Sequence, residues 1–141
     1  MDKKEFDEYV RTRYEYQVKW YDNQSISYKR LTYLFQIPMI SLSAIIPVFA
    51  VLDIRLVTVV MSAIVAVFMG ILNFSKFEEK WQNYRTTCEL LRKELYYFKS
   101  RIDHYKTAES PEELFVERIE SLISIEHTKW AAIEKEKHRK N

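Results

Sequence analysis

The chain has 141 residues, a formal net charge of +2 and 30% charged residues, a length typical of a single domain. The nearly balanced charge argues against a nucleic-acid binder, which needs an excess of Lys and Arg to neutralise phosphates. One glycine and three prolines disfavour turn-rich β architecture and predict long helices. The single cysteine, Cys88, excludes an internal disulfide and fits a reducing compartment.

Residues 2–30 are predicted to form a helix that carries one apolar and aromatic stripe. The stripe recurs at steps of three and four residues, and its members are Phe6, Val10, Tyr14, Val18, Tyr21, Ser25 and Tyr28. Such a stripe is typical of contact with a partner helix. The first apolar run begins only at Leu31, so we expect no cleaved signal peptide, and the chain ends carry no lipidation motif.

Residues 31–74 are almost wholly apolar and carry only two charges, Asp53 and Arg55. A helix needs about 20 apolar residues to cross a membrane, and the segments at about 31–52 and 56–74 each meet that length. We therefore predict a transmembrane helical hairpin. The two charges either keep the turn in water or form an outer charged ring.

Basic residues near the ends of the two spans predict the orientation. Lys19, Lys29 and Arg30 precede the first span, and Lys76, Lys80 and Arg85 follow the second. Only Arg55 lies between them. Because loops rich in Lys and Arg stay in the cytoplasm, both termini are expected there.

The second span is predicted to continue without a break to about residue 107, because no Gly or Pro occurs between Gly70 and Pro111. Its cytoplasmic part carries a heptad seam that requires partner helices, and the N-terminal stripe is the expected antiparallel partner. The members of the seam are Trp81, Tyr84, Cys88, Leu91, Leu95, Phe98, Ile102 and Tyr105.

A capping box, Ser110-Pro111-Glu112-Glu113, predicts a further helix over about 111–136. Its stripe consists of Phe115, Ile119, Leu122, Glu126, Trp130 and Ile133. The predicted fold is all-α: a two-span hairpin whose second helix extends into an antiparallel helical bundle, in a homo-oligomer. The predicted regions are 1–30 (cytoplasmic helix), 31–74 (hairpin) and 75–141 (cytoplasmic helices).

Polar residues of the second span share one side of the helix and are the candidate pore lining. They are Thr58, Ser62, Met69 and Asn73, continued by Lys76 and Lys80. A polar stripe on a membrane helix faces water or another helix rather than lipid. The alternative is helix packing, because Ser62, Ala66 and Gly70 have small-xxx-small spacing and hydroxyls can bond their own i−4 carbonyl. Thr32, Gln36 and Ser43 share a side of the first span.

The sequence predicts no enzyme, no catalytic residue and no cofactor. The three histidines are dispersed and show no metal-ligand spacing, so no metal site is expected. A phosphate-binding loop needs several glycines, and the chain has one.

Two blocks of the chain resemble a known family. The first is Trp81-x-x-Tyr84-Arg85-x-x-Cys88-Glu89-x-Leu91-Arg92-x-Glu94-x-x-Tyr97, and the second runs from Leu114 to Trp130. They are similar to the SLATT group of bacterial two-transmembrane proteins, in the branch long catalogued as a domain of unknown function. The resemblance covers the second span and the cytoplasmic helices well, and the first span only in general character.

The resemblance implies a membrane-embedded, pore-forming effector that oligomerises in the bacterial inner membrane and works with nucleotide-signalling immunity systems. This chain shows no synthase or sensor domain, so any trigger would come from a separate signalling protein or nucleotide; the alternative is a stand-alone channel with a housekeeping role. The residues that match the family pattern are Tyr84, Arg85, Glu89, Leu91, Glu94, Glu117, Arg118, Glu126, His127 and Trp130.

Charge spacing assigns some of the matched residues to helix pairing. Arg85 and Glu89 form an i,i+4 pair of opposite charge. We predict that Glu126 and His127 meet the long helix at the level of Tyr84 and Arg85. Trp130 lies on the same face as Glu126 and joins this pairing set.

The predicted function is a homo-oligomeric ion channel or pore whose partners are the lipid bilayer, further copies of the chain and the permeating ions. Two spans alone cannot enclose an aqueous path, so several copies are required. The alternative is a non-conducting membrane anchor whose cytoplasmic helices scaffold a protein partner. In that case leucine substitutions in the polar stripe would change stability rather than conductance.

Overall fold

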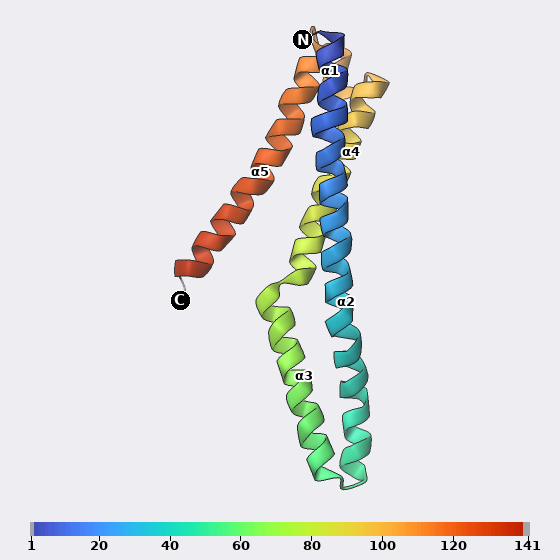
Figure 1. The fold of residues 1–141 in the computed structure, drawn as a ribbon, viewed down its shortest axis with the longest axis vertical. Coiled ribbons are helices and arrows are strands. Elements are labelled where there is room, and N and C mark those ends of the chain that lie inside the picture. Colours follow the sequence, from blue (N-terminus) through green and yellow to red (C-terminus); the bar gives the residue numbers. More distant parts are fainter. Residues whose placement is uncertain (1, 140–141) are drawn as a thin grey trace. The chain divides into compact units, whose positions relative to one another are not determined.

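The computed structural model describes the backbone of residues 2–139 and the side chains of residues 2–126 and 128. Every regular element in this part of the chain is a helix, which confirms the predicted all-α class. The chain divides into two compact units. We call the unit formed by residues up to Asn23 and from Tyr84 onward the bundle, and the unit formed by residues 24–83 the hairpin unit (Figure 1).

The bundle begins with α1 (Lys3–Tyr9), the π-helical turn η1 (Val10–Tyr14) and the first residues of α2 (Glu15–Val51). At the start of α1 the Glu5 carboxylate accepts a hydrogen bond of 3.2 Å from the Asp2 backbone N–H. The π turn carries one residue more than an α-helical turn. The larger, C-terminal part of α4 (Phe77–Ser100), the short 3-10 turn η2 (Asp103–Lys106) and α5 (Pro111–Arg139) complete the unit.

Contacts along the bundle show the direction of its helices. Phe6 packs on Phe98 with ring centroids 5.1 Å apart, and the Tyr14 hydroxyl donates a 3.0 Å hydrogen bond to the Leu91 carbonyl. Trp20 packs on Tyr84 at 5.6 Å. Residue numbers rise on the N-terminal segment as they fall on α4, so the two run antiparallel.

Helix α5 runs parallel to the N-terminal segment. Phe115 packs edge-on against Phe6, with ring centroids 5.7 Å apart, and Glu126 accepts a hydrogen bond from Tyr21. Three helical segments thus enclose one aromatic core. Its buried members are Phe6, Tyr14, Tyr21, Cys88, Leu91, Tyr105, Phe115, Ile119 and Ile123.

The hairpin unit consists of the rest of α2, a turn at residues 52–54, α3 (Arg55–Ser75) and the start of α4. Figure 1 shows α2 and α3 side by side, joined by the turn. Phe35 of α2 packs edge-on against Phe68 of α3, with centroids 5.7 Å apart. The less exposed positions of α3 recur at steps of three and four residues, as a two-helix seam requires; they include Thr58, Met61, Val65, Phe68 and Leu72.

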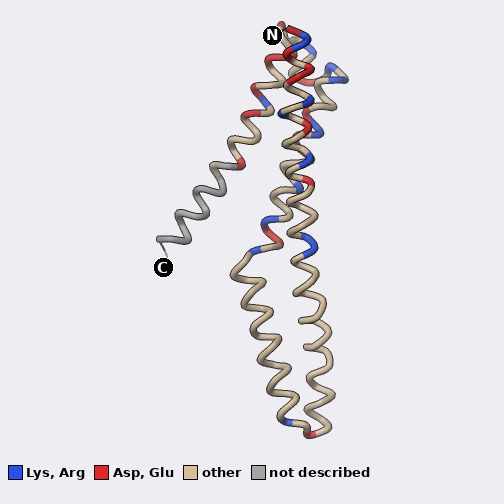
Figure 2. The backbone as a smooth tube through the Cα atoms, viewed as in Figure 1, with Lys and Arg blue, Asp and Glu red and all other residues tan. Residues whose placement is uncertain are grey.

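Both arms of the hairpin present an apolar surface. Helices α2 and α3 each contain a segment long and apolar enough to cross a membrane, by length and composition. Within α3, all of which the structure describes, no residue is fully buried. Figure 2 shows both arms of the hairpin almost without charge between the turn and the start of α4.

The prediction of one unbroken helix from the second span to residue 107 is wrong at two places. Lys76 adopts a left-handed conformation (φ 47°, ψ 41°) that ends α3, and α4 starts at Phe77. Glu78 and Glu79 in the first turn of α4 favour a helix start there, because carboxylates stabilise helix N-termini.

The second break follows Ser100, where α4 ends. Arg101 takes a left-handed φ of 50°, its N–H bonds the Phe98 carbonyl, and the Ile102 N–H bonds the Tyr97 carbonyl. This is the Schellman arrangement, which closes a helix by satisfying its last carbonyls. Tyr105 is still buried from η2, but Ile102 of the predicted seam is 40% exposed.

Candidate functional site

An open cavity of about 560 Å³ lies within the hairpin unit, at the end where α3 gives way to α4. Three elements contribute: α2, the C-terminal part of α3, and the first turns of α4. The lining residues are Thr32, Gln36, Met39, Met69, Leu72, Asn73, Lys76, Glu78, Glu79 and Gln82.

The lining of this cavity divides into an apolar and a polar part. Met39, Met69 and Leu72 are apolar, whereas the residues from Asn73 onward carry amides and charges. Lys76 Nζ lies 3.1 Å from a Glu79 carboxylate oxygen. The Gln82 amide donates a 3.3 Å hydrogen bond to Glu78. The cavity is therefore amphipathic, and its two acids and one base make the polar end net negative.

The predicted pore row is divided by the structure. Met69, Asn73 and Lys76 line the cavity, and Thr58 and Ser62 lie nearer the turn, outside it. Ser62, Met69 and Asn73 are exposed, whereas Thr58 is half-buried. Thr32 and Gln36 of the first span face the same cavity as Asn73, so polar residues of both spans converge at one end of the hairpin unit.

The hydroxyl groups of the spans bond carbonyls of their own helices. Thr58 Oγ1 donates to the Ile54 carbonyl at 3.1 Å, and Ser62 Oγ donates to the Thr58 carbonyl at 2.8 Å. Ser43 makes the same i−4 bond, to Met39, at 2.8 Å. These hydroxyls have a hydrogen-bond partner without water. The exposed Asn73 amide has two N–H donors and a carbonyl acceptor, which one carbonyl of its own helix cannot all satisfy.

Aromatic rings and lysines gather around the same end of the hairpin unit. Lys29 Nζ lies 6.0 Å from the centroid of the Tyr33 ring and 5.6 Å from that of Trp81. Lys80, which was predicted to continue the pore row, lies over the Tyr28 ring at 5.4 Å and does not line the cavity. Lysines with Tyr and Trp are typical of a membrane–water boundary.

At the turn, Arg55 pairs with Asp53 at 3.1 Å, and both side chains are largely exposed, at 88% and 79%. Asp53 has a left-handed φ of 54°, which the tight turn requires. The two residues of this ion pair belong to the same tight turn of one chain. Because both side chains are exposed, solvent screens the attraction between them.

The predicted pairing residues of the bundle form an ion-pair cluster. Arg85 contacts Glu89 on its own helix and Asp22 of α2 at 3.5 Å. Arg92 also reaches Asp22, at 3.3 Å. Asp22 therefore joins two arginines of α4, and sequence reasoning missed it because it lies beside the apolar stripe rather than on it.

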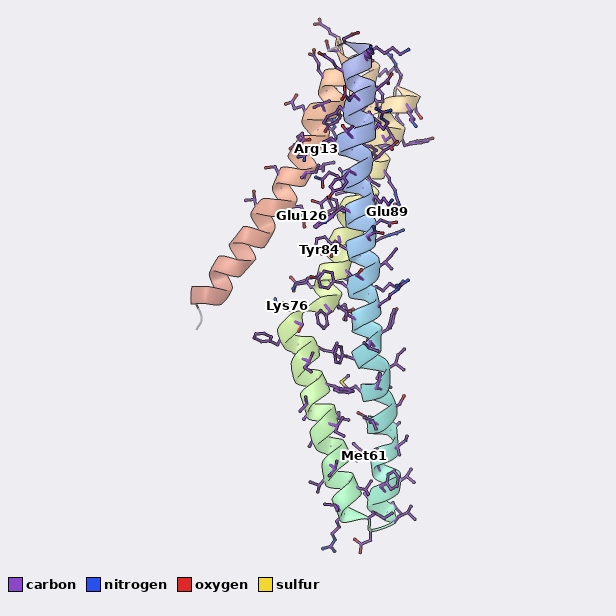
Figure 3. The ribbon with its side chains drawn as sticks, viewed as in Figure 1. Arg13, Met61, Lys76, Tyr84, Glu89 and Glu126 are labelled. Atoms are coloured by element: carbon purple, nitrogen blue, oxygen red, sulfur yellow. The ribbon has the colours of Figure 1, made fainter. Side chains whose placement is uncertain are left out.

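Glu126 reaches the level of Tyr84 through Tyr21. The Tyr21 hydroxyl donates a 3.0 Å hydrogen bond to Glu126, and the Tyr21 and Tyr84 rings lie 6.1 Å apart. Figure 3 labels Glu126 and Tyr84. Burial first, and then the Glu126 carboxylate, raise the pKa of Tyr21. The side chains of His127 and Trp130 lie outside the described residues.

Two further carboxylates join the bundle helices. Buried Glu94 accepts a 2.6 Å hydrogen bond from Tyr105 and pairs with Arg118 of α5. Burial alone would raise the pKa of Glu94, but the hydrogen bonds from Arg118 and Tyr105 hold it below its usual value. The sequence signal for this site was the match of Glu94 and Arg118 to the family pattern, but nothing in it showed that they meet.

The second carboxylate is Glu120 of α5. It accepts hydrogen bonds from Tyr9 at 2.9 Å and from Arg13 at 3.1 Å. The Arg13 guanidinium lowers the pKa of Glu120 against the opposing effect of burial. Neither Tyr9 nor Glu120 was predicted as a pairing residue, because hydrogen-bonded tyrosines look like core aromatics in sequence.

Cys88 of α4 is fully buried in the bundle, and its Sγ lies 3.7 Å from the Val18 carbonyl oxygen. Burial raises the pKa of the Cys88 thiol, which keeps it protonated and inert at neutral pH. Within the described part of the chain, no group of three or more His, Cys, Asp or Glu side chains could hold a metal ion.

Together these features define an all-helical protein that joins a helical bundle with an aromatic core and buried carboxylates to two candidate membrane-spanning helices. The family described as "Protein of unknown function (DUF4231)" matches residues 16–113, and the chain belongs to it. No curated protein and no solved structure matches the chain.

Proposed function

We propose that the chain is the subunit of a homo-oligomeric ion channel or pore in the bacterial inner membrane. In this proposal α2 and α3 span the bilayer, both termini lie in the cytoplasm, and the second span lines the path. The wider SLATT resemblance supports an effector role in stress or immunity signalling, with the trigger supplied by a separate protein or nucleotide.

The observation that carries the proposal is the exposure of polar side chains on α3. Ser62 is exposed outside the seam with α2, and Asn73 is exposed where it lines the open cavity. Placing an amide in hydrocarbon without a hydrogen-bond partner costs several kcal/mol of free energy, about as much as one hydrogen bond contributes in an apolar medium. Further copies of the chain would give this face neighbouring helices and water, and one hairpin alone cannot enclose a path.

Conductance of the protein reconstituted in planar bilayers tests the proposal. Asn73→Leu removes the amide at the polar end of α3 and is expected to change the single-channel conductance several-fold. Val67→Leu is the matched control, because Val67 is apolar and 60% exposed on another side of α3. Bilayers that stay silent for the unmodified protein under every applied voltage and trigger would contradict a channel.

The alternative is a non-conducting anchor whose bundle scaffolds a protein partner. The hydroxyl bonds of Thr58 and Ser62 to their own helix favour it, because these side chains are satisfied without a water path. In that case Ser62→Leu would change the thermal stability of the assembly, and Asn73→Leu would leave ion flux at the level of protein-free vesicles.

A further inference from the structure

The amphipathic cavity of the hairpin unit fits a ligand that is itself amphipathic. Its apolar part is formed by Met39, Met69 and Leu72, and its polar part includes Lys76, Glu78 and Glu79. A soluble ion would gain nothing from the apolar part, and a hydrocarbon would leave the charges unsolvated. An occupant that touches the whole lining needs a charged head and an apolar body.

The charges of the polar part restrict the head group. Two carboxylates and one ammonium favour a head with both a cationic and an anionic group, and the two acids disfavour a purely anionic head. The Glu78 carboxylate accepts one amide hydrogen bond, from Gln82, and a carboxylate offers about four acceptor positions. It therefore has capacity for ammonium N–H donors.

Lys76, whose Nζ lies 3.1 Å from a Glu79 carboxylate oxygen and is about half exposed, supplies the complementary cation. Lys76 takes the left-handed conformation that ends α3, as Arg101 does after α4. The conformation ends α3 and begins α4 beside the cavity, so the ammonium, the Glu78 and Glu79 carboxylates and the Asn73 amide line one space.

The surroundings of the cavity indicate where this ligand would come from. Lys29 lies near Tyr33 and Trp81, and Lys80 near Tyr28, all within the hairpin unit. Such lysine and aromatic pairs lie at the level of lipid head groups when a helix spans a bilayer. A cavity at this level opens onto phospholipids.

We propose that the cavity between Gln36, Asn73 and the Lys76–Glu79 segment binds one phospholipid with a primary-amine zwitterionic head group, phosphatidylethanolamine. The ammonium donates to Glu78 and Glu79, and the phosphate accepts from Lys76 and the Asn73 amide. The acyl chains lie along Met39, Met69 and Leu72. This inference rests on the membrane placement in the proposed function, but not on conduction.

Native mass spectrometry of the full chain in detergent, with added lipids, tests the site. Phosphatidylethanolamine, phosphatidylcholine and phosphatidylglycerol of equal chain length are compared at equal concentration. One retained phosphatidylethanolamine per chain is expected at about tenfold lower lipid concentration than for the other two, since charge-assisted N–H bonds distinguish the heads. Phosphatidylcholine is the sharpest comparison, because its quaternary ammonium has no N–H donor.

Variants locate the binding. The Glu78→Gln/Glu79→Gln double variant should lose the preference for phosphatidylethanolamine, and Lys76→Gln should weaken retention of all three lipids. Glu117→Gln is the control, because Glu117 is exposed on α5 in the bundle. Circular dichroism of each variant checks that the helices remain. Free phosphoethanolamine should not compete, because it cannot reach the apolar part of the lining.

Equal retention of the three lipids, or an unchanged preference in the double variant, would overturn the inference and mean unselective surface lipid. A lipid preference without conductance would leave the site standing and remove the channel. Conductance without a lipid preference would leave the channel standing and remove the lipid site. Extraction of native membranes with carbonate, run in parallel, shows whether the chain is membrane-integral, and release into the soluble fraction would overturn both proposals.

Discussion

The bundle and the hairpin unit are built from similar helices but are stabilised in different ways. The bundle buries an aromatic core and joins its helices through tyrosines and arginines that contact carboxylates, such as Tyr105 with Glu94 and Arg13 with Glu120. In the described hairpin unit only Ser25 and Thr32 are buried, and the outer faces are apolar. The bundle thus satisfies its own polar groups within one chain, whereas the hairpin presents surface that suits lipid or other copies.

The largest loss of stability is expected from a substitution in the bundle core, and it tests the contrast between the two units. Phe115 is fully buried and contacts Phe6, Tyr14 and Phe98. Phe115→Ala should lower the free energy of unfolding by about 3–5 kcal/mol, because it leaves a cavity among rings. Denaturant unfolding in detergent, followed by circular dichroism, measures this.

Val67→Ala in α3 is the matched control for the core substitution. Val67 is 60% exposed, so the change should fall within about 0.5 kcal/mol. Equal losses for the two variants would break the contrast, since they would mean that the outer face of the hairpin is buried as closely as the bundle core, within one chain or between copies.

A smaller effect is expected from the polar part of the bundle. Tyr105→Phe removes the hydroxyl that donates to buried Glu94 and should lower the free energy of unfolding by about 1–3 kcal/mol. Tyr96→Phe is the control, because Tyr96 is 64% exposed, and it should have no measurable effect. A Tyr105→Phe variant as stable as the unmodified protein would show that Arg118 alone satisfies Glu94.

The pH dependence of stability tests the same carboxylates and tyrosines. The lowered pKa values of Glu94 and Glu120 contribute stability that is present above about pH 4.3, the usual glutamate value, and is lost as the pH falls through their folded-state values. Burial raises the pKa of Tyr14 to about 12. Its contribution is complete below about pH 10 and is lost as the pH rises toward 12.

Thermal unfolding of the bundle between pH 2 and 12 measures both limbs, with tyrosinate absorbance as a direct readout at the alkaline end. We expect a plateau from about pH 5 to 10. Tyrosines that all titrate near pH 10 in the folded protein would contradict the buried hydroxyl contacts described above.

The smallest effect is expected at the junction of α3 and α4. Lys76→Gly and Lys76→Ala both remove the ammonium, and they differ in their tolerance of the left-handed backbone. The glycine variant should be more stable than the alanine variant by about 1–2 kcal/mol. Equal stabilities, measured by thermal unfolding in detergent, would indicate that α3 and α4 merge into one helix when the side chain is removed.

Periodicity predicted the helices and their pairing faces because burial follows the helical repeat. The seam residues Cys88 and Leu91 and the stripe residues Phe6, Tyr14 and Tyr21 are all buried. Two helix ends could not be predicted, since the rule that glycine marks such ends fails where Lys76 and Arg101 take the left-handed conformation.

The candidate sites were predicted less completely than the helices. Asn73, Lys76, Thr32 and Gln36 were recognised as polar residues of the spans, but their meeting in one cavity depends on the hairpin register, which a periodic pattern does not fix. The Glu94 and Glu120 contacts depend on residues more than ten positions apart, such as Glu94 with Arg118 and Tyr9 with Glu120.

The π turn at Val10–Tyr14 has a consequence for chain length. Tyr14 lies eight positions after Phe6, and eight steps of about 100° overshoot two helical turns by about 80°. The extra residue of the π turn absorbs this excess, so both rings face Phe115. Removing one exposed residue, such as Thr12, would leave a seven-residue spacing that a regular α-helix accommodates. Deletion of a single residue should therefore be tolerated at this turn, whereas the same deletion in the middle of α4 would rotate half of that helix's core positions toward solvent.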